Sequence, residues 1–80
     1  MIMRVIYLPP AFKALKRMQA KDRDAIDRKL EQFAATGVGD VTRMVGTPEY
    51  RLRHRDWRAV FVIEDDMIVL RIAHRSVVYR

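Results

Sequence analysis

The sequence predicts one α+β domain: an N-terminal strand, a two-helix hairpin, then an antiparallel meander of three to four strands. Three observations indicate this class. A short apolar run ends at two prolines, residues 10–35 carry apolar side chains at helical spacing, and apolar and charged residues alternate from about residue 41. Helices first and strands afterwards are typical of α+β proteins. At 80 residues the chain suits one small core, so we take residues 1–80 as a single domain.

Residues 3–8 are apolar and rich in branched side chains, which indicates a strand. Pro9 and Pro10 follow it and can begin a helix, because the first helical turn does not need their missing N–H groups. We expect this helix to run from about residue 10 to residue 20. Its apolar side is expected to comprise Phe12, Leu15 and Met18.

A second helix is expected from Asp22 or Asp24 to Ala35, since aspartates in the first turn favour the helix dipole and Gly37 or Gly39 can end it. Its apolar stripe is Ile26, Leu30, Phe33 and Ala34. Strands then follow at residues 41–45, 50–55, 57–64 and 67–74, separated by the turn residues Gly46-Thr47-Pro48, Asp56 and Asp65-Asp66.

The composition is that of a folded, strongly basic protein, with 50% hydrophobic residues and a formal net charge of +6. Every basic residue from 41 to 80 is arginine, whereas the first half mixes lysine with arginine. The guanidinium group forms a planar fork that suits phosphate and carboxylate, so the second half is the more specialised. These features favour a polyanionic partner.

The chain has no cysteine, which excludes disulfides, thiolate metal ligands and a cysteine nucleophile. No apolar run approaches the roughly 20 residues that a membrane span requires. The N-terminal apolar segment is too short for a secretory signal. We therefore expect a cytoplasmic protein without a membrane partner.

Arginines alternate along the strand at residues 50–55. Period two places Arg51, Arg53 and Arg55 on one face, and it places Tyr50, Leu52 and His54 on the other, toward the core. Two interpretations are equally open. The arginines bind an anionic partner, or they keep an edge strand soluble and unpaired.

Two further arginines interrupt apolar strands. Arg58 must face a groove or pair with an acid such as Asp56 or Glu64. Arg71 is expected to share a face with Val69, Ala73 and Arg75, so that arginines of three strands converge.

The sequence resembles the RelE/ParE toxin superfamily of type II toxin-antitoxin systems. The resemblance rests on the order of the elements, on Tyr50-Arg51-Leu52-Arg53, on the strand that begins Trp57-Arg58, and on the ending Ala73-His74-Arg75 with Tyr79. It covers nearly the whole chain and implies the RelE-like fold. Ala73 stands where the superfamily usually has glycine.

The resemblance implies a metal-independent ribosome-dependent endoribonuclease that needs no cofactor and cuts messenger RNA through its ribose 2′-hydroxyl. Arg51 and Arg53 match two lysines that serve as base and phosphate contacts in the RelE branch. Arg58 and Arg75 match arginines that stabilise charge at the scissile phosphate, and Tyr79 matches a tyrosine that orients the nucleotide.

Arginine is a poor proton acceptor, so Arg51 and Arg53 are expected to bind phosphate rather than to act as bases. His74 either assists proton transfer or, the interpretation we favour, is a strand-end histidine that bonds the backbone. His54 is expected in the core or at its rim. Tyr79 is either functional or a tail aromatic that covers the sheet edge.

Three functions remain open from the sequence. The first is the ribonuclease, with the ribosome and messenger RNA as partners. The second is a ParE-like toxin that poisons DNA gyrase without catalysis. The third is an inactive member that only binds its antitoxin. In each case the resemblance implies an acidic antitoxin, encoded beside the toxin.

Overall fold

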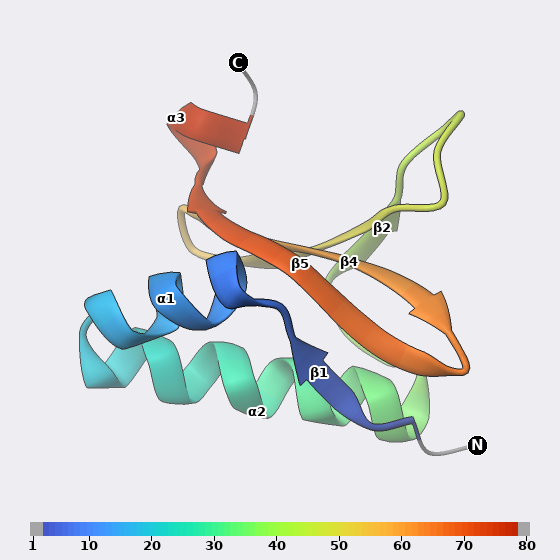
Figure 1. Ribbon diagram of the computed structural model, residues 1–80, viewed down its shortest axis with the longest axis horizontal. Helices are drawn as coiled ribbons and strands as arrows, with labels where there is room; N and C mark the ends of the chain where they lie inside the picture. The colour runs from blue at the N-terminus through green and yellow to red at the C-terminus, as the bar shows by residue number, and fades with distance from the viewer. Residues whose placement is uncertain (1–2, 79–80) are drawn as a thin grey trace.

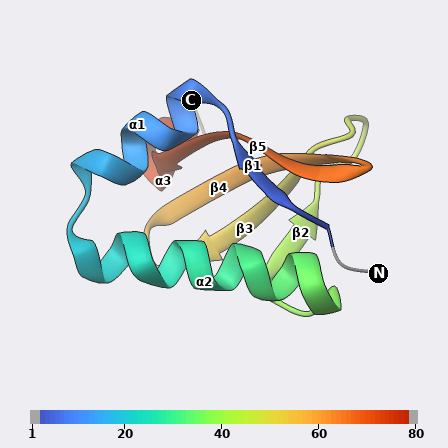
Figure 2. The same cartoon turned by 60° about the horizontal axis from the view of Figure 1, so that its bottom comes forward.

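Five strands form one sheet, and two helices cover one of its faces (Figure 1, Figure 2). The computed structural model describes residues 3–78. Its elements in chain order are β1 (Val5–Tyr7), α1 (Pro9–Arg17), α2 (Ala20–Thr36), β2 (Val41–Arg43), β3 (Tyr50–His54), β4 (Trp57–Glu64), β5 (Asp66–His74) and α3 (Arg75–Val78). The predicted α+β class and the order of its elements are confirmed, and α3 is an element that the sequence did not indicate.

The strands from β2 to β5 form the predicted antiparallel meander, and β1 pairs with β5 at the edge of the sheet opposite β2. The spatial order is β1-β5-β4-β3-β2, with β1 parallel to β5. Val5 lies opposite Met67, and the amide of Leu8 donates to the carbonyl of Val69 at 3.0 Å. The first strand of the chain is therefore paired with the last.

Helix α1 begins at Pro9 as predicted, and of its expected apolar residues Leu15 and Met18 are buried but Phe12 is not. Ala11 and Leu15 are buried, whereas Phe12 is 54% exposed and Lys16 Nζ lies 5.5 Å from the centre of its ring. Neighbouring positions on a helix lie about 100° apart, so burying Ala11 turns Phe12 toward solvent. The expectation that Phe12 belongs to the buried stripe was wrong.

Helix α2 supplies the largest helical contribution to the core. Ile26, Leu30 and Ala34 are buried, as the spacing predicted. The helix ends at Gly37, whose φ of 74° is the left-handed conformation that glycine adopts without steric cost, and whose amide donates to the Phe33 carbonyl at 2.8 Å.

The sheet contributes Leu52, Phe61, Met67 and Val69 to the same core. Phe61 is fully buried, and the ring of Tyr50 stacks on it at a centroid distance of 5.3 Å. The face of the sheet that packs on α1 and α2 is called the helix-covered face below, and the opposite face is called the outer face.

A β-bulge between β4 and β5 changes which residues share a face. The pairing register shifts between Val60, which lies opposite Arg71, and Phe61, which lies opposite Val69. Val69 therefore faces the core with no exposed surface, while Arg71 lies with Val60 on the outer face. The expectation that Val69 shares a face with Arg71 was wrong, because strict alternation ignores the extra residue of a bulge.

Two polar contacts tie β1 to the rest of the fold. The Arg4 guanidinium Nη2 lies 2.9 Å from Asp66 Oδ2, and the hydroxyl of Tyr7 donates to Asp27 Oδ1 at 2.6 Å. The hydrogen bond from Arg4 lowers the pKa of Asp66. Burial, together with the neighbouring carboxylate of Asp27, raises the pKa of the Tyr7 hydroxyl.

No helix within residues 3–78 combines the length and apolar character that a membrane span needs.

Replacing Leu30 tests the core. Leu30→Ala removes a side chain with no exposed surface, and the cavity should lower the free energy of unfolding by about 2–5 kcal/mol. Urea denaturation measures the difference. Val45→Ala is the matched control, because Val45 is 99% exposed and its truncation should change stability by less than about 0.5 kcal/mol.

The Arg4–Asp66 pair predicts a pH effect. Because the pKa of Asp66 is lowered in the folded state, the pair stabilises the fold above the pKa of the unfolded state. That contribution is lost as the pH falls through the folded-state pKa. In Arg4→Ala, NMR titration should show the Asp66 pKa rising toward its ordinary value. An unchanged titration curve would show that the pair does not form in solution.

Candidate functional site

The outer face of the sheet carries the arginines that the alternation pointed to. In the pairing of β3 with β4, Arg53 lies opposite Arg58 and Arg51 lies opposite Val60. Leu52 and His54 point to the other face and are buried, with 1% and 8% of their surfaces exposed. The expected division of β3 into a basic face and a core face is therefore present from residue 50 to residue 54.

Three of the arginines surround one hollow of about 250 Å³ on this face. Its lining residues are Asp40, Thr42, Met44, Arg51, Arg53 and Arg58. This hollow is called the arginine hollow below. The strands β2, β3 and β4 position its walls, because antiparallel pairing places Thr42 opposite Arg51.

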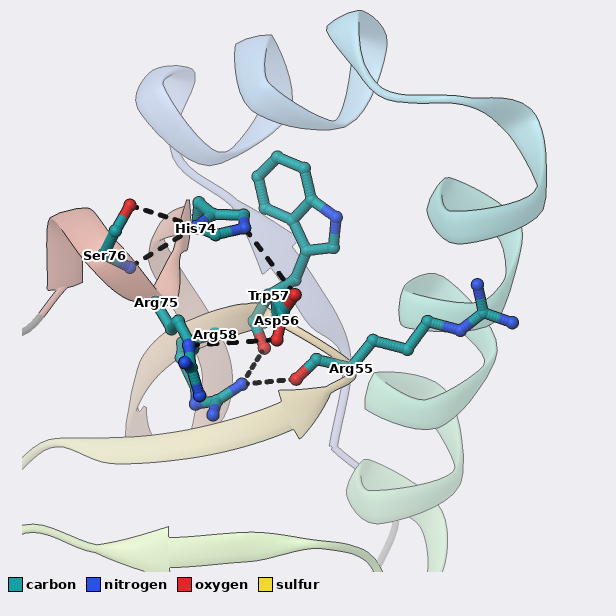
Figure 3. Close-up of polar contacts among 7 residues, drawn as sticks. All are labelled: Arg55, Asp56, Trp57, Arg58, His74, Arg75 and Ser76. Carbon is teal, nitrogen blue, oxygen red and sulfur yellow. Dashed lines mark hydrogen bonds and ion pairs between the residues drawn. The ribbon is translucent and has the colours of Figure 1, made fainter.

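Arg58 is the most buried of these arginines, with 8% of its surface exposed. Its Nη1 donates to the carbonyls of Arg55 and Trp57 at 2.7 and 2.9 Å (Figure 3). Of the two sequence alternatives, it faces a groove. These carbonyls, rather than the carboxylates of Asp56 or Glu64, hold the guanidinium in place.

Arg53 is paired with a carboxylate that the sequence analysis did not identify. Its Nε lies 3.0 Å from Asp40 Oδ2, and its backbone amide donates to the Asp40 carbonyl at 2.9 Å. Directly opposed like charges destabilise a strand pair, so the carboxylate of Asp40 offsets the repulsion between Arg53 and Arg58. A sequence signal for Asp40 did exist: counting the strand pairing back from the turn at residues 46–48 brings it beside Arg53.

Arg55 does not share the face of Arg51 and Arg53, contrary to the expectation from alternation. Its φ of 54° places it in the left-handed region, and this reverses the direction of its side chain. In Figure 3 the Arg55 side chain points away from Arg58. Arg55 instead lines a neighbouring hollow of about 370 Å³, together with Lys29 and Gln32 of α2. Asp40 and Arg53 line both hollows.

Arg75 reaches the same turn from the C-terminal end of β5, where His74 lies opposite Trp57. Its backbone amide donates to the Asp56 carbonyl at 2.6 Å, and its Nε lies 3.9 Å from Asp56 Oδ1. Arg75 and Arg58 both bond the turn at residues 55–57, but Arg75 does not line the arginine hollow. The predicted convergence thus has two parts: three arginines around a hollow, and Arg75 held beside it through the turn.

His74 lies on the helix-covered face, opposite Trp57. The two rings meet edge to face at a centroid distance of 5.8 Å. Nδ1 of His74 lies 3.0 Å from Ser76 Oγ and 3.4 Å from the Ser76 amide, while Nε2 lies 3.9 Å from Asp56 Oδ2 (Figure 3). The geometry matches the favoured interpretation, a strand-end histidine that bonds the backbone. Tyr79 lies outside the described residues.

His54 is a buried bridge rather than a site residue. Its Nδ1 lies 2.8 Å from Lys29 Nζ, and its Nε2 lies 3.1 Å from Asp22 Oδ1. Because the ammonium of Lys29 has only donors, Nδ1 accepts and Nε2 donates. The imidazole therefore links β3 to α2 at the rim of the core, as the sequence analysis expected. Across residues 3–78, no three His, Asp or Glu side chains gather in a way that could hold a metal ion.

Comparison with known proteins identifies the family. Residues 5–79 match the sequence profile of the ParE toxin of the type II toxin-antitoxin system parDE. The match spans nearly the whole chain, and the protein belongs to this family of toxins. No curated protein matches the sequence.

Solved structures of toxins share the fold. A mutant of Escherichia coli RelE in the free state is 19% identical with a TM-score of 0.82, and the match covers 99% of this chain and 92% of that chain. The RelE–RelB complex of Pyrococcus horikoshii gives 21% identity, a TM-score of 0.79, and coverage of 94% and 97%. The YoeB dimer of Staphylococcus aureus is 18% identical with a TM-score of 0.75, and the match covers 92% of this chain and 98% of that chain. At these identities the likeness extends to the fold.

The site predicts a structural role for Arg58 in addition to its position in the hollow. Arg58→Ala leaves two carbonyls without their charged donor and should lower the free energy of unfolding by about 2–3 kcal/mol. Chemical denaturation measures this loss. Arg71→Ala is the control on the same face, since Arg71 is exposed and lies 3.8 Å from Glu49, and it should cost less than about 1 kcal/mol. Equal losses in the two variants would contradict the assigned role.

Proposed function

We propose that this toxin is a ribosome-dependent endoribonuclease that inhibits translation by cutting messenger RNA. One observation carries the proposal: Arg51, Arg53 and Arg58 line a single hollow on an otherwise regular sheet face. Guanidinium groups arranged in this way match the oxygens of a phosphodiester, which is the group that carries negative charge in an RNA substrate.

The chemistry of such a cut defines roles for these residues. The ribose 2′-oxygen forms a bond to phosphorus while the bond from phosphorus to the 5′-oxygen breaks, and negative charge builds up on the phosphate oxygens. Arg58 is held rigidly by two carbonyls, so it can stabilise that charge without reorganising. Arg51 and Arg53 bind the phosphate, and Arg75 adds positive charge from beside the turn.

The 2′-hydroxyl must also lose a proton, and the leaving 5′-oxygen must gain one. Asp40 is the carboxylate among the residues that line the arginine hollow, and it is 59% exposed at its side chain. We assign it as the proton acceptor of this site. Its ion pair with Arg53 holds the carboxylate beside the guanidinium groups that bind the phosphate, and water supplies the proton that the leaving 5′-oxygen gains.

An acidic antitoxin is the second partner that we propose. The chain carries a net charge of +6, and the structural relatives include RelE–RelB toxin-antitoxin complexes. An acidic chain encoded beside this one would neutralise the basic surface. Copurification of that neighbour with the tagged toxin tests the pairing.

The family assignment favours a second candidate function. The matched profile describes the ParE toxin of the type II system parDE. The resemblance to ParE-like toxins implies that such a toxin poisons DNA gyrase through protein contacts. On that alternative the arginine hollow would be a contact surface for protein carboxylates. Transcripts would then remain intact while double-strand DNA breaks accumulate.

The double variant Arg51→Ala/Arg53→Ala tests the ribonuclease. Without the two phosphate contacts, cleavage should fall by roughly 100-fold or more, measured by primer extension on messenger RNA after induced expression. Arg28→Ala is the matched control, because Arg28 is exposed on α2, away from the outer face, and its loss should leave cleavage unchanged. Intact transcripts together with DNA breaks in cells that express the natural toxin would replace the ribonuclease with the gyrase poison.

A further inference from the structure

His74 stands at the start of helix α3 in the position of an N-cap. Helix α3 begins at Arg75, so Ser76 is its second residue, and the Ser76 amide points at His74 Nδ1 from 3.4 Å. A side-chain acceptor that takes the amide of the second or third helical residue is how an N-cap stabilises a helix start. Histidine seldom serves in this way, because only an unprotonated ring nitrogen can accept.

The hydrogen-bond partners define the tautomer of the ring. Nδ1 faces two groups of Ser76, the backbone N–H at 3.4 Å and the hydroxyl Oγ at 3.0 Å. The N–H can only donate and the hydroxyl can donate as well, so an unprotonated Nδ1 accepts from both. The ring proton then belongs on Nε2, which lies 3.9 Å from the carboxylate of Asp56. The edge of Trp57 packs against the same ring. The imidazole is therefore held by α3, by the turn at Asp56 and by β4 (Figure 3).

The residue that this cap positions is Arg75. Arg75 is the first residue of α3, and its amide and its guanidinium both contact Asp56, the residue that faces His74 Nε2. His74 itself pairs with Trp57 on the helix-covered face, whereas Arg58 lies on the outer face. The ring is thus placed to orient α3, and its position does not bring it into the arginine hollow.

We propose that His74 is a positioning residue, which caps α3 through Nδ1 and thereby holds Arg75 beside Arg58, and that it transfers no proton in the reaction. The inference rests on the proposed ribonuclease function, because Arg75 is the residue whose contribution it sets. Substitution of His74 by asparagine or by glutamine can distinguish this positioning role from a role in acid–base catalysis.

Asparagine and glutamine test the two nitrogens of the ring separately. The Oδ1 atom of asparagine can replace Nδ1 as the cap acceptor, while the amide of glutamine reaches the position of Nε2 and leaves the Ser76 amide without a partner. Neither amide can exchange a proton near neutral pH. We expect His74→Asn to cleave messenger RNA at nearly the natural rate, and His74→Gln to cleave roughly fivefold more slowly, the factor by which losing a typical cap depopulates a helix start.

A double-mutant experiment tests whether the effect of His74 substitution on cleavage depends on Arg75. In an Arg75→Ala background, His74→Gln should cause no further loss, because the cap then positions nothing. Arg28→Ala is the control, since Arg28 is exposed on α2 and, within residues 3–78, forms no hydrogen bond or ion pair with His74 or α3, and it should leave cleavage unchanged. Equal loss in His74→Asn and His74→Gln, or a full further loss in the Arg75→Ala background, would overturn the proposal.

A measurement on the purified toxin–antitoxin complex separates this inference from the proposed function. The ¹⁵N NMR shifts of the His74 ring should show an unprotonated Nδ1 and a protonated Nε2 in the natural protein. A ring protonated at Nδ1 would overturn the cap even if messenger RNA is cleaved. The expected tautomer in a protein that leaves messenger RNA intact would instead reject the ribonuclease and keep the cap.

Discussion

The candidate site depends on one tight turn, at residues 55–57, which joins β3 to β4. The carbonyls of Arg55 and Trp57 hold the guanidinium of Arg58, and the carbonyl of Asp56 holds the backbone of Arg75. The Asp56 carboxylate lies 3.9 Å from both Arg75 Nε and His74 Nε2. A three-residue segment therefore sets the relative positions of charged groups that are far apart in the sequence, and the left-handed conformation of Arg55 makes this geometry possible.

Arginines gathered on one sheet face repel one another, and the fold contains specific compensations for this. Asp40 neutralises Arg53, and backbone dipoles satisfy Arg58. Val60 is fully buried on the outer face between its partners Arg51 and Arg71, which fits aliphatic arginine stems covering an apolar side chain. Three arginines and one aspartate are among the residues that line the arginine hollow, so its lining carries a net positive charge that suits an anionic ligand.

Sequence periodicity predicted the strands, the helices and the basic face of β3, because hydrophobic spacing directly reflects burial. It failed where a single backbone residue departs from the regular geometry. The positive φ of Arg55 turns that side chain away from Arg58, and the bulge opposite Val60 places Val69 and Arg71 on different faces. Neither the positive φ nor the bulge can be recognised from the alternation of apolar and charged residues in the sequence. The backbone contact of His74 was the expected one, whereas helix α3, which supplies the contacting amide, was not expected, because its four residues have no apolar stripe.

The parallel pairing of β1 with β5 has a consequence for synthesis on the ribosome. Val5 lies opposite Met67 in the sheet, so β1 has no partner strand until β5 has been synthesised. The sheet core that supports the turn is closed only after most of the chain has emerged, and closing so long a loop delays folding. Because the amide of Arg75, just after β5, donates to the Asp56 carbonyl, the turn at residues 55–57 also lacks this support until β5 has been made.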